Sequence, residues 1–194
     1  MHEFSFLIYN LVIFPIIAGL LVVNKDFVSF FLGKDFQAAN IAIAIMVFRM
    51  FFIGWTNIMG IQILIPHNKH REFMLSTTIP AFVSVGLNLL LIPPFGFIGA
   101  SIVSVLTEAL VWVIQLNFAR KFMKDVSILP AMSKIIIASV VMYLGLFVFR
   151  TFVQFKPMLN VAVDGFVGAI IYLILIVVLR VLDVRDLKEQ LMKN

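Results

Sequence analysis

The sequence lacks cysteine and has little charge, and both absences narrow what the chain can be. Without Cys among its 194 residues, it has no disulfide, thiolate metal site or cysteine nucleophile. Charged residues make up 13% of the chain and hydrophobic residues 62%, whereas soluble domains average about 25% charged and about 45–50% apolar. A soluble globule needs more polar surface than this, and a disordered chain needs lower hydrophobicity. The mean hydropathy of +1.10 therefore predicts a membrane protein.

Motifs for enzyme chemistry are also missing. The sequence contains neither the GxxxxGK[ST] nucleotide loop nor the HExxH zinc motif. Its three His residues lie at the N-terminus (His2) or in one short segment (His67 and His70), where Lys69 and Arg71 would repel a cation. We therefore expect no enzyme, no metal site and no cofactor.

Six stretches are long and apolar enough to cross a membrane as helices, which takes about 20 residues. They are longer than the alternating segments of about ten residues that build a β-barrel. The predicted spans are 4–23, 38–65, 73–92, 97–118, 134–152 and 161–182. The sequence thus predicts an all-α integral membrane protein with one transmembrane domain over residues 1–194. Pro15 and Pro80 lie inside spans, where we expect neighbouring helices to satisfy the carbonyl groups that proline leaves free.

The basic residues predict the orientation of these spans. Ten Lys and Arg fall in the 66–72 loop, the 119–134 loop and the C-terminal segment, against four in the connections on the other side. Positive charge accumulates on the cytoplasmic side of membrane proteins, so we expect both termini in the cytoplasm, with 183–194 as a cytoplasmic tail. This placement favours membrane topology over nucleic-acid binding as the reason for the net charge of +5. The polar segment 24–37 is expected at the outer interface, broken at Gly33.

Two charges lie deep inside predicted spans. Arg49 and Glu108 are each about 11 residues from the outer end of their span, and at about 1.5 Å per residue both reach about 16 Å, near mid-bilayer. Charges at this depth pair with one another or face a water-filled path. Equal depth makes an Arg49–Glu108 pair geometrically possible, and both a static brace and a substrate or proton path remain open.

Three successive spans, the second to the fourth, carry stripes of polar residues at helical spacing. We expect these helices to enclose a polar interior, although small-residue stripes also serve close helix packing. The last two spans carry no such stripe and are expected toward lipid, with Asp164 solvated near the outer interface. The candidate substrate-path residues are Arg49, Thr56, Asn57, Asn88, Ser104, Glu108 and Gln115.

Short motifs resemble those of bacterial polysaccharide-biosynthesis flippases. The segment 31–36, FLGKDF, resembles an element of Leu-Gly, two charges and an aromatic residue in that family. The segment 92–101, IPPFGFIGAS, resembles its turn between two late helices. Glu108 and the pair Arg120-Lys121 also fall at matching places. The resemblance covers the chain to about residue 125, and the superfamily also contains the multidrug MATE exporters.

The resemblance implies two helical bundles around a central cavity and alternating access that moves a lipid-linked oligosaccharide across the bacterial inner membrane. The six spans would then be part of the second bundle of a MATE-like transporter plus two extra helices. The expected partners are membrane lipids and an N-terminal half or another copy. The anionic pyrophosphate of such a substrate would give Arg49 a reason to face the cavity. The alternatives are a MATE-type drug/cation antiporter half, with Glu108 as coupling carboxylate, and a non-transporting membrane scaffold or assembly subunit.

Overall fold

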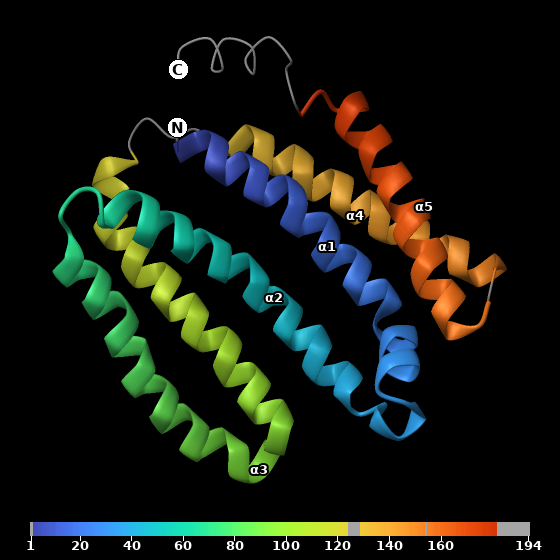
Figure 1. Ribbon diagram of the computed structural model, residues 1–194, viewed down its shortest axis with the longest axis horizontal. Helices are drawn as coiled ribbons and strands as arrows, with labels where there is room; N and C mark the ends of the chain where they lie inside the picture. Colours follow the sequence, from blue (N-terminus) through green and yellow to red (C-terminus); the bar gives the residue numbers. More distant parts are fainter. Residues whose placement is uncertain (1, 124–128, 154, 182–194) are drawn as a thin grey trace.

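The computed structural model describes residues 2–123, 129–153 and 155–181, and the regular structure in this part of the chain is entirely helical (Figure 1). Five helical segments are long and apolar enough to cross a membrane, which indicates a multi-pass membrane protein. They are α1 (His2–Phe31), α2 (Ala39–Asn57) with its π-helical continuation η2 (Ile58–Leu64), α3 (His70–Ala119), α4 (Leu129–Phe152) and α5 (Pro157–Val178). Single 3₁₀ turns follow α1 and α3, at Lys34–Phe36 and Arg120–Phe122. The predicted tail, 183–194, lies outside the described residues.

The predicted six separate spans are therefore five helices, because the stretches 73–92 and 97–118 fall within the single element α3. No loop separates them. The helix continues through Pro93 and Pro94, and within α3 only Gly96 leaves helical geometry, with φ 55° and ψ −133°. Figure 1 shows the consequence: the chain reverses there, and α3 runs back beside itself as a first limb (70–95) and a second limb (97–119).

Two glycines make this reversal possible. The positive φ of Gly96 belongs to a region that side chains with a Cβ rarely enter. Gly99 is needed for space, since a Cβ built there would overlap the carbonyl oxygen of Leu91 across the turn. The glycine pair in the segment 92–101 is thus explained by the backbone path alone.

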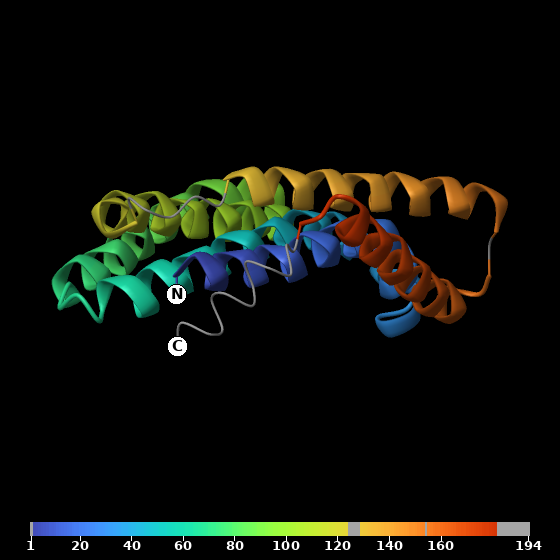
Figure 2. The ribbon, with the colours of Figure 1, turned by 90° about the horizontal axis from the view of Figure 1, so that it is seen from above.

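Helix α1 lies at the centre of the molecule, contacting α2 on one side and α4 and α5 on the other. In Figures 1 and 2, α3 packs on α2, and the α4–α5 pair covers the opposite flank of α1. The sequence placed the last two spans toward lipid, and the structure adds that one face of each packs on α1. Ala18 of α1 is buried with Ile135 and Leu146 of α4 and Tyr172 of α5 in one apolar cluster. Apolar packing of this kind leaves no polar stripe in the sequence.

Two features of α1 depend on its neighbours. Pro15 has no backbone N–H, so the Leu11 carbonyl four residues earlier loses its helical donor. The Tyr172 hydroxyl of α5 donates to that carbonyl at 2.8 Å, which confirms that a neighbouring helix satisfies it. The helix also continues to Phe31, beyond the predicted end at residue 23, and stops before Gly33, where φ is 94°. The break at Gly33 was expected, but the extension was not.

Candidate functional site

Arg49 and Glu108 form an ion pair that ties α2 to the second limb of α3. The Arg49 Nη2 atom lies 2.8 Å from Glu108 Oε1, and the bond satisfies hydrogen-bond geometry. The pairing that equal depth made possible is thus present in the structure. It joins residues 59 positions apart, so the two helices are in direct contact at this level.

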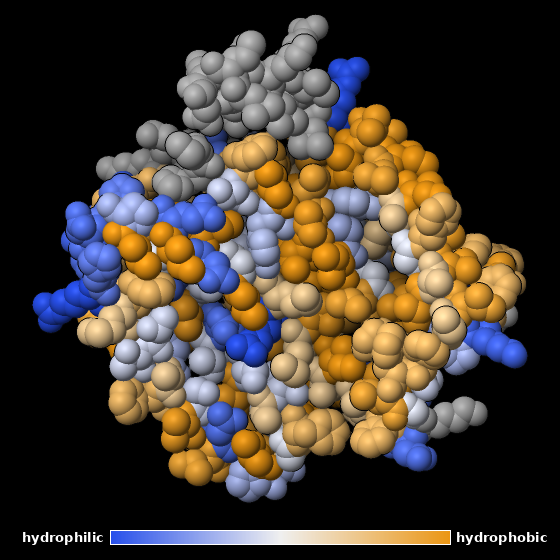
Figure 3. Space-filling view, in the orientation of Figure 1, coloured by the Kyte–Doolittle hydropathy of each residue, from blue (hydrophilic) through white to orange (hydrophobic). Residues whose placement is uncertain are grey.

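The pair remains open to its surroundings. The side chain of Arg49 is 37% exposed and that of Glu108 is 20% exposed. The Nε atom of Arg49 is buried and has no hydrogen-bond partner in the described structure. Figure 3 shows hydrophilic atoms interrupting the hydrophobic surface over α2 and α3. The exposed part of the guanidinium can bind a polar or anionic group.

Most of the other predicted path residues bond only within their own helix. The hydroxyl of Thr56 donates to the Ile53 carbonyl at 2.9 Å, and that of Ser104 donates to the Ala100 carbonyl at 2.9 Å. Asn88 donates to the Ser84 carbonyl at 2.9 Å, and Asn57 is exposed. In the described part of the chain, no hydrogen bond links any of these residues to the Arg49–Glu108 pair.

Gln115 lies in a different environment, buried beside the π-helix η2. It is 1% exposed, and its Oε1 atom finds no partner among the described residues. A Cβ built on Gly60 would lie 3.1 Å from Gln115 Nε2 and 2.5 Å from the Phe73 ring. Gly60 therefore lets both limbs of α3 approach η2 closely. This contact supports a packing role for Gln115 and Gly60 more directly than a substrate path.

Sequence reasoning missed a second charged cluster, centred on Arg150 near the end of α4. Its Nη2 atom lies 2.6 Å from both Asp164 of α5 and Asp26 of α1, and its Nη1 donates to the Val22 carbonyl at 3.0 Å. Asp164 is 3% exposed, so the expectation that it is solvated near the interface is wrong. A guanidinium bound in this way joins three helices. The sequence signal was only that all three charges lie near predicted span ends on the same side.

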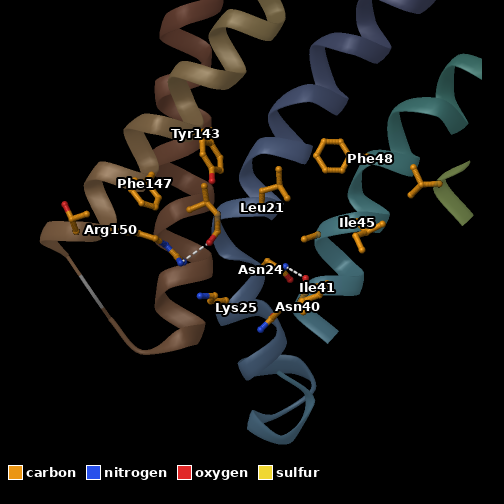
Figure 4. Close-up of a pocket in the computed structure, with 14 residues that line it drawn as sticks. Leu21, Asn24, Lys25, Asn40, Ile41, Ile45, Phe48, Tyr143, Phe147 and Arg150 are labelled. Carbon is orange, nitrogen blue, oxygen red and sulfur yellow. Dashed lines mark hydrogen bonds between the residues drawn. The ribbon is translucent and has the colours of Figure 1, made fainter. Parts of the chain in front are cut away.

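A cavity of about 920 Å³ lies between α1, α2 and α4, with Val105 of α3 also lining it, and it was also not predicted (Figure 4). Asn24 and Lys25 of α1, Asn40 of α2 and Arg150 of α4 contribute its polar groups. None of the predicted path residues lines it. The structure thus separates two places of interest, the Arg49–Glu108 pair on α2–α3 and this cavity.

The class of protein that these observations define is an all-α protein with several apolar helices, which indicates multiple membrane crossings. Comparisons of the chain with known protein families, with curated proteins and with solved structures find no match. The described residues contain no cluster of His, Asp and Glu suited to holding a metal ion.

Proposed function

We propose that this chain is the C-terminal portion of a polysaccharide exporter that flips a lipid-linked oligosaccharide across the bacterial inner membrane by alternating access. The observation that carries the proposal is the Arg49–Glu108 pair, an ion pair at mid-span depth that stays partly exposed. A purely structural pair in a membrane is best sealed from lipid, because an exposed charge there is costly. An exposed one indicates that this surface faces a polar path or a second helical body.

The substrate chemistry fits the charge of the site. A lipid-linked oligosaccharide carries an anionic pyrophosphate, and the guanidinium of Arg49, whose side chain is 37% exposed, offers it a charge-assisted hydrogen bond. The reversal at Gly96 and the close approach at Gly99 give a physical reason for the glycines of the segment 92–101, on which the resemblance to flippases depends. The exposed charge is therefore the feature that supports the proposal, since the backbone path already explains the glycines.

In this proposal the chain crosses the membrane six times, with each limb of α3 crossing once. The first limb, 70–95, would be about 39 Å long and the second, 97–119, about 34 Å, at about 1.5 Å per residue. Both exceed the hydrocarbon thickness of about 30 Å. Both termini then lie in the cytoplasm. The missing wall of the transport cavity is supplied by an N-terminal half or another copy.

The test is mutagenesis of the pair in the cell that carries this gene, with surface polysaccharide measured relative to the amount of protein in the membrane. Arg49→Ala and Glu108→Gln should each lower surface polysaccharide at an unchanged protein level. Asn117→Ala is a matched control, because Asn117 is exposed on the same limb as Glu108 and bonds only the Val113 carbonyl. Normal polysaccharide in both pair variants would refute a transport role.

A charge exchange separates this role from a brace. The double variant Arg49→Glu with Glu108→Arg keeps opposite charges facing each other, so the protein level should stay unchanged while transport is lost. A protein level that falls in the single variants and recovers in the exchange, together with transport, would assign the pair to stability alone and favour the scaffold alternative. Loss of drug resistance in place of polysaccharide would favour the antiporter alternative, with Glu108 coupling to a cation.

A further inference from the structure

A continuous groove runs along α1 between α2 and α4. The cavity of about 920 Å³ adjoins a second one of about 560 Å³, and the two share Leu21, Phe48 and Tyr143 in their linings. The second cavity extends toward the start of α4, where Met132 and Ile136 line it. The groove therefore has two parts that differ in chemistry.

The polar groups of the groove gather at one end, which Figure 4 shows around Asn24, Lys25 and Asn40 on α1 and α2. Among the described residues, no carboxylate lines either cavity. Arg150 also lies at this end; with Asp26 and Asp164 it forms a cluster of one net negative charge, but neither carboxylate lines the groove. Lys25 forms no ion pair with any described residue and lines the groove, so its ammonium is the unpaired cation that a ligand there would meet. This end of the groove therefore favours an anion.

Two buried oxygen atoms at the same end require hydrogen-bond donors. Asn24 is 6% exposed, and its Nδ2 donates to the Asn40 carbonyl at 2.6 Å. The Oδ1 atoms of Asn24 and Asn40 are both buried without a partner in the described structure. A buried acceptor left unpaired costs about 1–3 kcal/mol. A ligand with hydroxyl groups would supply the missing donors.

The remainder of the groove is apolar. The second cavity is lined by aliphatic and aromatic side chains, among them Phe14 and Phe51, with Ser139 as the exception beside the shared Tyr143. Such a surface along a membrane helix suits an acyl chain. The groove thus combines a cationic, acceptor-rich end with an apolar channel.

We propose that this groove binds an anionic phospholipid with a hydroxylated headgroup. Its phosphate pairs with Lys25, a headgroup hydroxyl donates to Asn24 Oδ1, and one acyl chain lies between α2 and α4. The occupant is a lipid of the surrounding bilayer, held whether or not the chain takes part in transport. The proposal therefore does not rest on the flippase assignment.

The test is native mass spectrometry of the full chain in detergent, titrated with three lipids of identical acyl chains. Phosphatidylglycerol has one negative charge and headgroup hydroxyls, phosphatidylethanol has the same charge without hydroxyls, and phosphatidylcholine is zwitterionic. We expect one lipid to bind per chain. Phosphatidylglycerol should bind most tightly, phosphatidylethanol less tightly and phosphatidylcholine least tightly. Equal retention of all three lipids would overturn the proposal.

Two variants assign the preference to the groove. Lys25→Gln should weaken phosphatidylglycerol binding about fivefold to tenfold, the value of one charge-assisted contact. Lys156→Gln should leave binding unchanged, since Lys156 is equally an exposed cation but does not line the groove. Asn24→Leu should abolish the preference for phosphatidylglycerol over phosphatidylethanol. Both anionic lipids should still bind more tightly than phosphatidylcholine. Equal weakening by both lysine variants would show unspecific attraction and refute the site, provided that thermal unfolding shows all variants folded.

Discussion

The bond between Tyr172 and the Leu11 carbonyl should matter only because Pro15 is present. Proline removes the N–H that would otherwise bond this carbonyl, and the Tyr172 hydroxyl replaces it at 2.8 Å. Tyr172 is 7% exposed, so water does not substitute for a lost hydroxyl. Tyr172→Phe therefore leaves an acceptor unpaired in apolar surroundings.

The expected loss in the free energy of unfolding for Tyr172→Phe lies between two known ranges. An unpaired buried acceptor costs about 1–3 kcal/mol in soluble proteins, whereas bonds between membrane helices average about 0.6 kcal/mol and reach about 1.7 kcal/mol. We expect Tyr172→Phe to lower the free energy of unfolding by about 1–1.5 kcal/mol. In a Pro15→Ala background, the restored N–H bonds the Leu11 carbonyl, and the same change should cost less than about 0.5 kcal/mol.

The assay is unfolding in mixed micelles by increasing detergent denaturant, followed by the fluorescence of Trp55 and Trp112. The four proteins of the cycle give a coupling energy between positions 15 and 172 of about 1 kcal/mol. If Tyr172→Phe costs the same with Pro15 and with Ala at position 15, the explanation is refuted, and the hydroxyl acts elsewhere.

Further predictions concern the Arg150 cluster and one helix contact, in the same unfolding assay. Arg150→Met leaves two facing carboxylates uncompensated and should lower the free energy of unfolding by about 3–5 kcal/mol. Asp164→Asn keeps a bond to the guanidinium and should lower it by about 1 kcal/mol. A larger loss in Asp164→Asn than in Arg150→Met would contradict the contacts described for this cluster. Gly54→Ala should cost at least about 2 kcal/mol, because a Cβ there overlaps the Tyr9 ring. Gly86→Ala is its control: nothing lies within 4 Å, so it should stabilise by about 0.5–1 kcal/mol. A destabilised Gly86→Ala would show that helix α3 is packed there by something else.

Hydropathy predicted most of the helical segments, because a membrane helix must be apolar over its whole length. It missed that the stretches 73–92 and 97–118 form the single element α3, because two limbs joined by one residue differ from two separate helices only in a backbone angle. The depth argument placed Arg49 and Glu108 together because both are charges inside apolar runs, where the sequence signal is strongest. The depth argument failed for Asp164, whose partner Arg150 lies near the end of a different predicted span.

The sequence did not predict the groove, for a different reason. Its residues come from four helices and follow no common spacing, and its diagnostic feature is an unpaired Lys25 beside unpaired amide oxygens. Whether a polar group has a partner depends on tertiary contacts, which a single sequence does not contain. The packing of α4 and α5 on α1 was missed similarly, since apolar helix faces look alike toward lipid and toward protein.

The two charged clusters lie on either side of the contact between α1 and α2, and neither crosses it. Arg49–Glu108 joins α2 to α3, and Arg150 joins α1, α4 and α5. The α1–α2 contact depends instead on close packing and neutral hydrogen bonds, such as Trp55 Nε1 donating to Asn10 Oδ1 at 3.0 Å. Neutral bonds and packing exchange partners at lower cost than desolvated charges. If the molecule changes conformation, α2–α3 and α1–α4–α5 should therefore move as two units about this contact. The proposed lipid groove lies between α2 and α4, where such a movement would change its width.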